Sequence, residues 1–204
     1  MRTGVQLRPD LMLVARQVQD GSRVLDLGCG YGELLAYLMA SKLCSGTGVE
    51  RDPQGVLSAI RQGVPLIELD IDTQLAQFGD DSYDVVVLSR TLQAVLQPRN
   101  VLEEMARIGK RLIVTMPNFG YWRHRLTLLG GHMPQSRDLP FTWYETPNLH
   151  HATLIDLEGF FTGIGLSIQK RIPLDDAGRP MSLGQRAANL RASSAIYVLN
   201  SPPR

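Results

Sequence analysis

A glycine-rich turn between a β-rich run and a helical stretch constrains the fold of this chain more than any other feature. The segment is VLDLGCGYGELL, from Val24 to Leu35. Its glycines let the main chain pass close to a ligand, because no Cβ atom stands in the way. An apolar strand, a glycine loop and a helix in this order are typical of a nucleotide-binding α/β protein.

The spacing of the glycines distinguishes between two kinds of ligand. Gly28, Gly30 and Gly32 form the pattern GxGxG, whereas the dinucleotide pattern GxGxxG needs a glycine where Glu33 stands. S-adenosylmethionine (SAM) has no phosphate to place on a helix N-terminus, and it carries a cationic amino group and a sulfonium. Asp26 can supply a carboxylate for that cation. The loop therefore predicts a site for SAM, or for its demethylated product S-adenosylhomocysteine, and disfavours NAD.

Two further acids stand at predicted strand ends. Glu50 follows the glycine loop by about 20 residues, where a carboxylate can accept both ribose hydroxyls. Asp70 can face the adenine amino group, with Ile71 packing against the ring. The alternatives are that Glu50 is a surface acid and that Asp70 or Asp72 caps the next helix.

The run VVVLS ends at Ser89, and we predict that Ser89 lies beside the methionine part of the cofactor, with Arg90 as a second candidate neighbour. The alternative is that both residues simply leave a strand. Methyl transfer from a sulfonium needs alignment more than acid or base, so no catalytic residue is assigned. The following text, SRTLQAV, lacks the Asn-Pro-Pro-aromatic and Pro-Cys signatures of nucleic-acid methylation.

Short apolar runs alternate with helical stretches, as expected for a parallel sheet covered by helices. The predicted strands are Arg23 to Leu27, Gly46 to Glu50, Pro65 to Leu69, Asp84 to Ser89 and Arg111 to Met116. The predicted helices are Leu11 to Gln19, Glu33 to Ser41, Pro53 to Arg61 and Arg99 to Ile108.

The C-terminal part predicts the rest of the sheet. A helix from Thr153 to Phe161 begins with a capping box between Thr153 and Asp156. Apolar residues then alternate with polar ones from 166 to 172, as in an antiparallel strand, and Ala195 to Leu199 can pair with it. The whole predicts an α/β, Rossmann-like class I SAM-methyltransferase fold with a mostly parallel seven-stranded sheet, a C-terminal antiparallel pair and helices on both faces.

Residues 117–152 form an aromatic and basic segment without clear periodicity, which we predict to be a functional loop inserted into the domain. Its histidines are candidate bases, but none has a visible orienting partner, and His150 and His151 favour a backbone or capping role. The aromatic side chains suit a lid or binding face as well as they suit cover for the sheet edge.

The composition limits the class of protein. The 21 basic and 20 acidic residues nearly cancel, so no overall field favours nucleic acid or an anionic membrane. Two cysteines, Cys29 and Cys44, fit neither a disulfide framework nor a zinc site and suggest a reducing compartment. The N-terminus is broken by charges and carries no signal-peptide core or membrane span. We expect a single cytoplasmic domain over residues 1–204, without a metal.

Several segments together resemble the MetW family of methionine biosynthesis proteins. They are LRPDL, VLDLGCGYGELLAYL, GVERD, VTMPNFGYWRHRL and WYETPNLHHATLIDLEGF, and they cover nearly the whole chain. The last two are more specific than the glycine loop, which any class I methyltransferase shares. The resemblance implies a bacterial cytoplasmic protein that works with homoserine O-acyltransferase, acetyl or succinyl, in making methionine.

Two functions follow. In the first, the protein is a SAM-binding accessory subunit that assembles with the acyltransferase. In the second, it is an active methyltransferase acting on a small molecule, which the intact glycine loop allows. The sequence offers a candidate surface for contact with the acyltransferase, because interface hot spots are enriched in Trp, Tyr and Arg. Such residues gather at Tyr121, Trp122, Arg123, Arg125, Trp143 and Tyr144.

Overall fold

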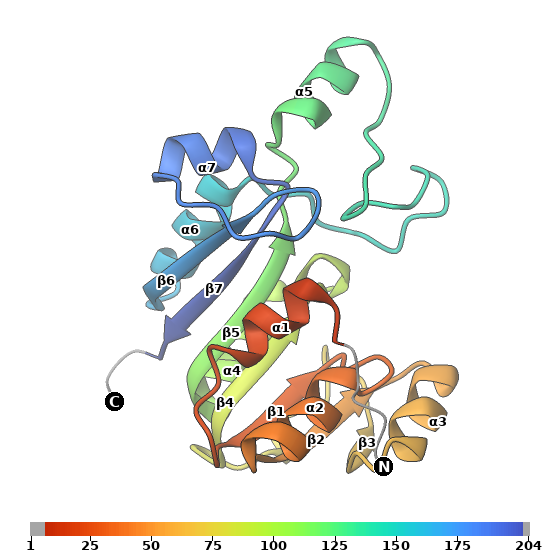
Figure 1. Ribbon diagram of the computed structural model, residues 1–204, viewed down its shortest axis with the longest axis vertical. Helices are drawn as coiled ribbons and strands as arrows, with labels where there is room; N and C mark the ends of the chain where they lie inside the picture. Colours follow the sequence, from red (N-terminus) through yellow and green to blue (C-terminus); the bar gives the residue numbers. More distant parts are fainter. Residues whose placement is uncertain (1–6, 202–204) are drawn as a thin grey trace.

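The computed structural model describes residues 7–201, which form one seven-stranded sheet with helices on both faces (Figure 1). The strand order is β3-β2-β1-β4-β5-β7-β6. Strands β1 to β5 run parallel, and β7 lies antiparallel between β5 and β6. The strands are β1 (Arg23–Leu27), β2 (Ser45–Glu50), β3 (Leu66–Glu68), β4 (Tyr83–Ser89), β5 (Gly109–Pro117), β6 (Ser167–Leu174) and β7 (Ser194–Asn200). The predicted sheet is therefore confirmed.

Nearly all predicted elements lie within two residues of their predicted ends. The helices are α1 (Pro9–Ala15), α2 (Glu33–Lys42), α3 (Pro53–Arg61), α4 (Pro98–Ile108), α5 (Trp122–Leu129), α6 (Leu154–Gly163) and α7 (Gln185–Arg191), with short 3-10 helices η1 (Leu75–Gln77) and η2 (Leu92–Ala94). The predicted end of the first helix, Gln19, is wrong: α1 ends at Ala15. After it, Gln17 and Val18 donate to carbonyls only three residues back, so the chain tightens into turns.

The core has two layers, one on each face of the sheet. Alternate residues of the central strands point to opposite faces, as the pleat requires, and both faces are buried. Leu25 and Leu27 pack with the side chains of α4 and α6, whereas Val24 packs with α1, α2 and α3. The continuous apolar runs of the sequence are thus explained by helices on both sides.

The predicted capping box at the start of α6 is confirmed. Thr153 Oγ1 accepts from the backbone N–H of Asp156, and the Asp156 carboxylate accepts from the backbone N–H of Thr153. Further along α6, the buried Glu158 accepts hydrogen bonds from Arg171 of β6 at 2.6 Å and from the hydroxyl of Tyr197 of β7 at 3.0 Å. These bonds attach α6 to the antiparallel pair.

Residues 118–152, which we call the arm, extend past the end of the sheet (Figure 1). The prediction that this whole segment is a loop is wrong, because it contains α5. Among the residues of α5 only His124 is buried, so the helix has no apolar stripe from which it could be predicted. The later helix α7 was not predicted either.

Candidate cofactor site

The glycine loop connects the end of β1 to the start of α2. Gly28, Gly30 and Gly32 have φ angles of 67°, 55° and 79°, in the left-handed region that side chains with a Cβ rarely adopt. The loop is held to β2 by a 2.9 Å hydrogen bond from the backbone N–H of Cys29 to the carbonyl of Val49. The backbone conformation therefore explains the glycines at all three predicted positions.

The three glycines differ in what surrounds them. A Cβ atom at Gly28 would lie 2.7 Å from Thr91 Oγ1, and one at Gly32 would lie 2.9 Å from the Cβ of Ala59 in α3. A Cβ atom at Gly30 would meet nothing within 4 Å. Gly28 and Gly32 therefore permit close packing within the protein, whereas no protein atom fills the space beside Gly30.

Glu50 joins the end of β2 to the glycine loop. Its Oε2 accepts from the backbone N–H of Gly30 at 2.7 Å, and its Oε1 accepts from the backbone N–H groups of Arg51 and Asp52 at 2.8 and 2.9 Å. A carboxylate offers about four acceptor positions. Two ribose hydroxyls bound to Glu50 would therefore displace at least one of these backbone donors.

An open cleft lies at the carboxyl ends of β1 and β2, with a cavity volume of about 120 Å³. Of the eight residues predicted to bind the cofactor, Gly28, Glu50, Asp70 and Ile71 line this cleft. Asp26, Gly30, Gly32 and Ser89 lie outside its wall. The other lining residues are Val49, Arg51, Leu69, Asp72, Thr91, Ala94 and Val95.

Asp26 lies beneath the cleft and is almost completely buried. Burial raises the pKa of its carboxyl from 3.8 to about 7, and the neighbouring Glu50 carboxylate adds to the increase. A cation brought close to Asp26 would favour its charged form. The buried acid is thus suited to a cationic ligand such as the amino group of SAM.

The acids after β3 are tied into the cleft wall. Asp70 Oδ1 accepts from the backbone N–H of Asp72 at 2.9 Å, and Asp70 Oδ2 lies 3.7 Å from a guanidinium nitrogen of Arg51. Asp72 accepts from the backbone N–H groups of Leu96 and Gln97 at 2.9 and 3.0 Å. Asp72 therefore ties the segment after β3 to the turn before α4, and the capping alternative is wrong, because neither η1 nor α4 begins with a side-chain cap.

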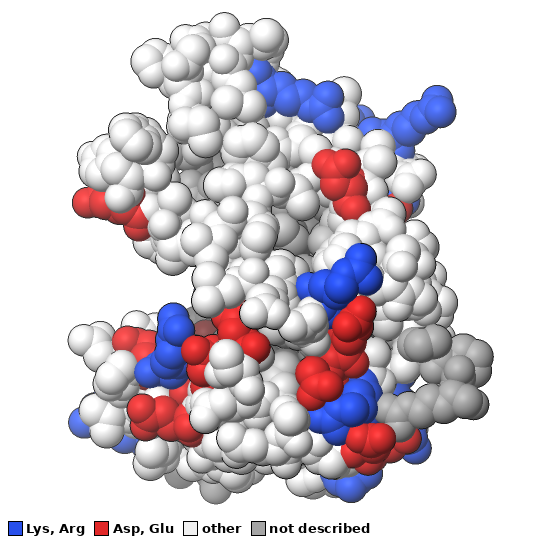
Figure 2. Space-filling view, turned by 180° about the vertical axis from the view of Figure 1, so that it is seen from behind, with Lys and Arg blue, Asp and Glu red and all other residues white. Residues whose placement is uncertain are grey.

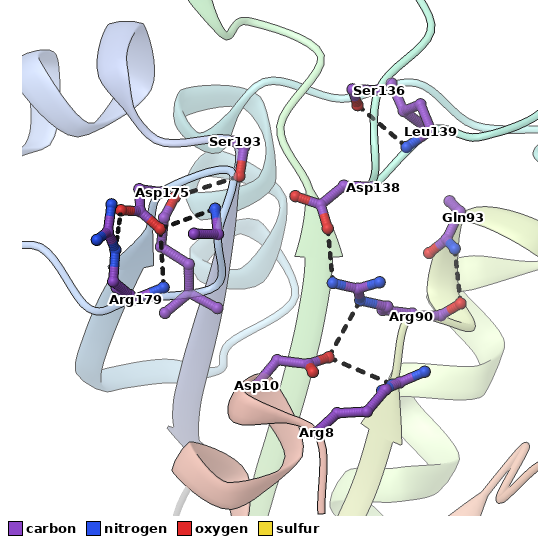
Figure 3. Close-up of polar contacts among 12 residues, drawn as sticks. Arg8, Asp10, Arg90, Gln93, Ser136, Asp138, Leu139, Asp175, Arg179 and Ser193 are labelled. Atoms are coloured by element: carbon purple, nitrogen blue, oxygen red, sulfur yellow. Dashed lines mark hydrogen bonds and ion pairs between the residues drawn. The ribbon is translucent and has the colours of Figure 1, made fainter.

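The predicted neighbours at the end of β4 differ from each other. Ser89 ends the strand, and its buried hydroxyl has no hydrogen-bond partner within residues 7–201. Arg90 does not line the cleft: its guanidinium lies 3.3 Å from Asp10 of α1 and donates to Asp138 of the arm at 2.6 Å (Figure 3). Because these acids are far away in the sequence, the pattern around Ser89 gave no sign of this arrangement.

Three lining residues that follow β4 were missed. Thr91, Ala94 and Val95 form a wall of the cleft through a turn and the short helix η2. The only signal was their position directly after Ser89, because ligands of open α/β sheets bind at the carboxyl ends of strands.

Acidic and basic side chains are interspersed on the surface of the lower part of the molecule, and the surface is hollowed between that part and the arm (Figure 2). The hollow opens on the side toward which β1 and β2 point in Figure 1. No His, Cys, Asp or Glu set of three or more within residues 7–201 is placed to hold a metal ion. In the same residues, no helix combines the length and apolar character needed to cross a bilayer.

None of the histidines of the arm faces the cleft wall. His124 is buried, its Nδ1 lies 3.1 Å from the carbonyl oxygen of Asn118, and burial lowers its pKa. The backbone N–H of His150 donates to the carbonyl of Gln93 at 3.0 Å, which is a backbone role of the predicted kind. His151 packs edge-on against Phe119.

Comparison with solved structures identifies the fold. In the complex between the Haloferax volcanii Trm112 methyltransferase activator and the putative methyltransferase, one chain superposes with a TM-score of 0.71 at 18% identity. The match covers 96% of this chain and 90% of that chain. The predicted class I methyltransferase fold is thereby confirmed.

Similar sequences are found over the whole chain and over part of it. A bifunctional methionine biosynthesis protein MetXA/MetW of Rhodopirellula baltica is 30% identical over 213 residues, which cover 98% of this chain but 34% of that protein. A ubiquinone biosynthesis O-methyltransferase of Aeromonas salmonicida is 33% identical over 118 residues, covering 54% of this chain and 49% of that protein. The chain thus spans about a third of the first relative and matches about half of the second.

The family is shown by a match along most of the chain. The family model of methionine biosynthesis protein MetW matches residues 8–199, which include the glycine loop, the arm and the antiparallel pair. The chain therefore belongs to the MetW family of methionine biosynthesis proteins.

Proposed function

We propose that this chain is a bacterial cytoplasmic accessory protein that binds SAM or S-adenosylhomocysteine and assembles with homoserine O-acyltransferase, acetyl or succinyl. The observation that carries the proposal is the relative in which a MetW part and a MetXA part belong to one bifunctional protein. Two domains joined in one chain are held at a high effective concentration relative to each other. Such a fusion favours domains that work together, and this supports the same association where the two are separate proteins.

The cleft supports the cofactor part of the proposal. Its wall holds two acids at the ends of neighbouring strands, Glu50 and Asp70, and Glu50 is hydrogen-bonded to the backbone N–H of Gly30. Asp26 beneath the loop is a buried acid that a cation would keep charged. Such an arrangement favours a cationic nucleoside over a pyrophosphate.

The arm supports the partner part, because it exposes large apolar side chains. A group of this size on one projecting segment is characteristic of a binding surface. Trp143 is 71% exposed and Tyr144 is 68% exposed. The other exposed residues of this surface are Trp122, Leu126, Leu128, Leu129, Met133, Phe141 and Leu149. Tyr121, which we expected among them, is buried against Trp122 and His124.

The alternative, an active small-molecule methyltransferase, is favoured by the similarity to a ubiquinone biosynthesis O-methyltransferase. Because that similarity covers about half of the chain, it fits a shared cofactor site as well as shared catalysis. The cleft wall also contains no histidine or lysine to act as a base, within the part of the chain that the structure describes.

The deciding experiment combines the purified chain with homoserine O-acyltransferase of the same host. We expect the two proteins to co-elute in gel filtration and the acyltransferase activity to rise when this chain is added. Separate elution at micromolar concentration, with equal acyltransferase activity alone, would favour the alternative. Conversion of SAM to S-adenosylhomocysteine in the presence of cell extract would support the methyltransferase directly.

A further inference from the structure

One short segment connects the cofactor cleft to the arm. We call residues 90–97, between β4 and α4, the bridge segment. Thr91, Ala94 and Val95 face the cleft, whereas Arg90 and Gln93 hold the arm. The same eight residues therefore contact both the cleft and the arm.

On the cleft side, the bridge segment has two attachments. The side chain of Thr91 packs so close to Gly28 that a Cβ there would lie 2.7 Å from its hydroxyl oxygen. At the other end, Asp72 accepts the backbone N–H groups of Leu96 and Gln97. Both attachments involve residues that line the cleft, so a ligand that fills it contacts the bridge segment and its anchors.

On the arm side, the bridge segment holds the second half of the arm at two points. The guanidinium of Arg90 donates to the carboxylate of Asp138 at 2.6 Å (Figure 3). The carbonyl of Gln93 accepts from the backbone N–H groups of Leu149 and His150 at 2.8 and 3.0 Å. Three residues of the exposed apolar surface, Phe141, Trp143 and Tyr144, lie in the chain between these two points.

The ion pair between Arg90 and Asp138 is largely buried. Asp138 and Asp10 are 7% and 2% exposed, and both contact the guanidinium of Arg90. Arg90 has a φ of 56°, a left-handed conformation that a residue with a side chain adopts only when its surroundings hold it there. Because a buried charge is strongly unfavourable without its partner, separating Asp138 from Arg90 would be energetically costly.

We propose that occupancy of the cofactor cleft repositions the arm through the bridge segment, with the ion pair between Arg90 and Asp138 as the link. The inference rests on the proposed cofactor site and adds a mode of regulation to it. By reciprocity, a partner that binds the arm changes the affinity of the cleft for its ligand by the same factor.

Tryptophan fluorescence reports on the arm, because both tryptophans of the chain, Trp122 and Trp143, lie in it. The experiment measures tryptophan emission while S-adenosylhomocysteine is titrated, and calorimetry on the same samples measures binding. The test variant is Asp138→Asn, which keeps the shape of the side chain and removes its charge. The matched control is Asp84→Asn, which alters an acid 3.7 Å from Arg23 at the opposite end of β4.

We expect ligand to bind all three proteins and to shift the emission of the wild type and of Asp84→Asn. The shift in Asp138→Asn should be at least threefold smaller. A second variant, Arg90→Gly, removes the link from the other side and accepts the left-handed backbone. It should lose the shift as well, and circular dichroism checks that each variant is folded.

The outcomes separate the two proposals. Binding by calorimetry with an unmoved wild-type emission, or an undiminished shift in both link variants, would overturn the coupling and leave the cofactor site in place. No heat of binding to the wild type would overturn the cofactor site, and the coupling with it.

Discussion

The carboxylate of Glu50 accepts a hydrogen bond from the backbone N–H of Gly30 at 2.7 Å, so the end of β2 holds the glycine loop from the cleft side. The side chain that we predict to bind the ribose, Glu50, is therefore also the side chain that holds the glycine loop. The amide of a glutamine at this position can accept at only one atom and carries no charge.

Glu50→Gln should weaken binding of S-adenosylhomocysteine. Hydrogen bonds to charged groups are worth about 1.5–3 kcal/mol, which corresponds to roughly a 10- to 150-fold loss of affinity. Calorimetry measures it, with Glu68→Gln as control, since Glu68 pairs with Glu50 in the register of β2 and β3 but does not line the cleft. Equal affinities of both variants would show that the ribose lies elsewhere.

Gly30→Ala should lower both stability and ligand affinity. The left-handed φ of 55° penalises any side chain by about 1–2 kcal/mol. Gly21→Ala is the matched control: its φ is 76°, it has equally open surroundings and it lies away from the cleft. Both should lose similar stability in urea, and only Gly30→Ala should lose binding. Unchanged affinity would remove Gly30 from the ligand-binding surface.

Asp26 should make the protein less stable as the pH rises. Its pKa is about 7 in the folded state and 3.8 when exposed, so the folded state binds the extra proton between these values. The contribution of Asp26 to the free energy of unfolding is then greatest below pH 4. It declines as the pH rises through 7, by up to roughly 4 kcal/mol. Urea unfolding between pH 4.5 and 8 measures the slope, which Asp26→Asn should flatten.

A cationic ligand should reverse this effect at Asp26. If its ammonium group keeps the carboxylate charged, binding near pH 6.5 releases a proton. Calorimetry in phosphate and in Tris should then give different apparent enthalpies, because the two buffers differ in their heat of protonation. Identical enthalpies in both buffers would mean that the ligand does not reach Asp26.

Trp122→Ala should weaken the complex with homoserine O-acyltransferase. Truncation of a central aromatic anchor typically costs about 2–4 kcal/mol, or roughly thirty- to a thousandfold in affinity. Leu57→Ala is the control, since Leu57 is an exposed apolar residue on α3, outside the arm. Titration with the purified enzyme measures both. A similar effect of the two variants, or none, would place the interface outside the arm.

Features with a local cause could be predicted from the sequence. The glycine loop, the strand ends at Glu50 and Ser89 and the capping box of α6 each depend on a few adjacent residues. The hydrogen bond from Gly30 to Glu50 could not be anticipated in detail, but both residues were placed at one site.

Features that depend on residues far apart in the chain could not be predicted from the sequence. Arg90 and Asp138 are 48 positions apart, and in the sequence each resembles an ordinary surface charge. Helix α5 escaped prediction because its buried contact is His124 rather than a row of apolar side chains. In the sequence Tyr121 resembles its exposed neighbour Trp122, although the structure buries it between Trp122 and the buried His124.

The antiparallel position of β7 has a consequence for the order of folding. Strand β5 is almost entirely buried, and one of its two neighbours is formed by residues 194–200, which follow it by nearly 80 positions. Until that segment arrives, β5 presents an apolar edge with unpaired backbone groups, and β6 cannot join the sheet because it pairs only through β7. Such an edge invites pairing between chains. Aggregation between chains therefore competes with closure of the sheet until β7 is in place.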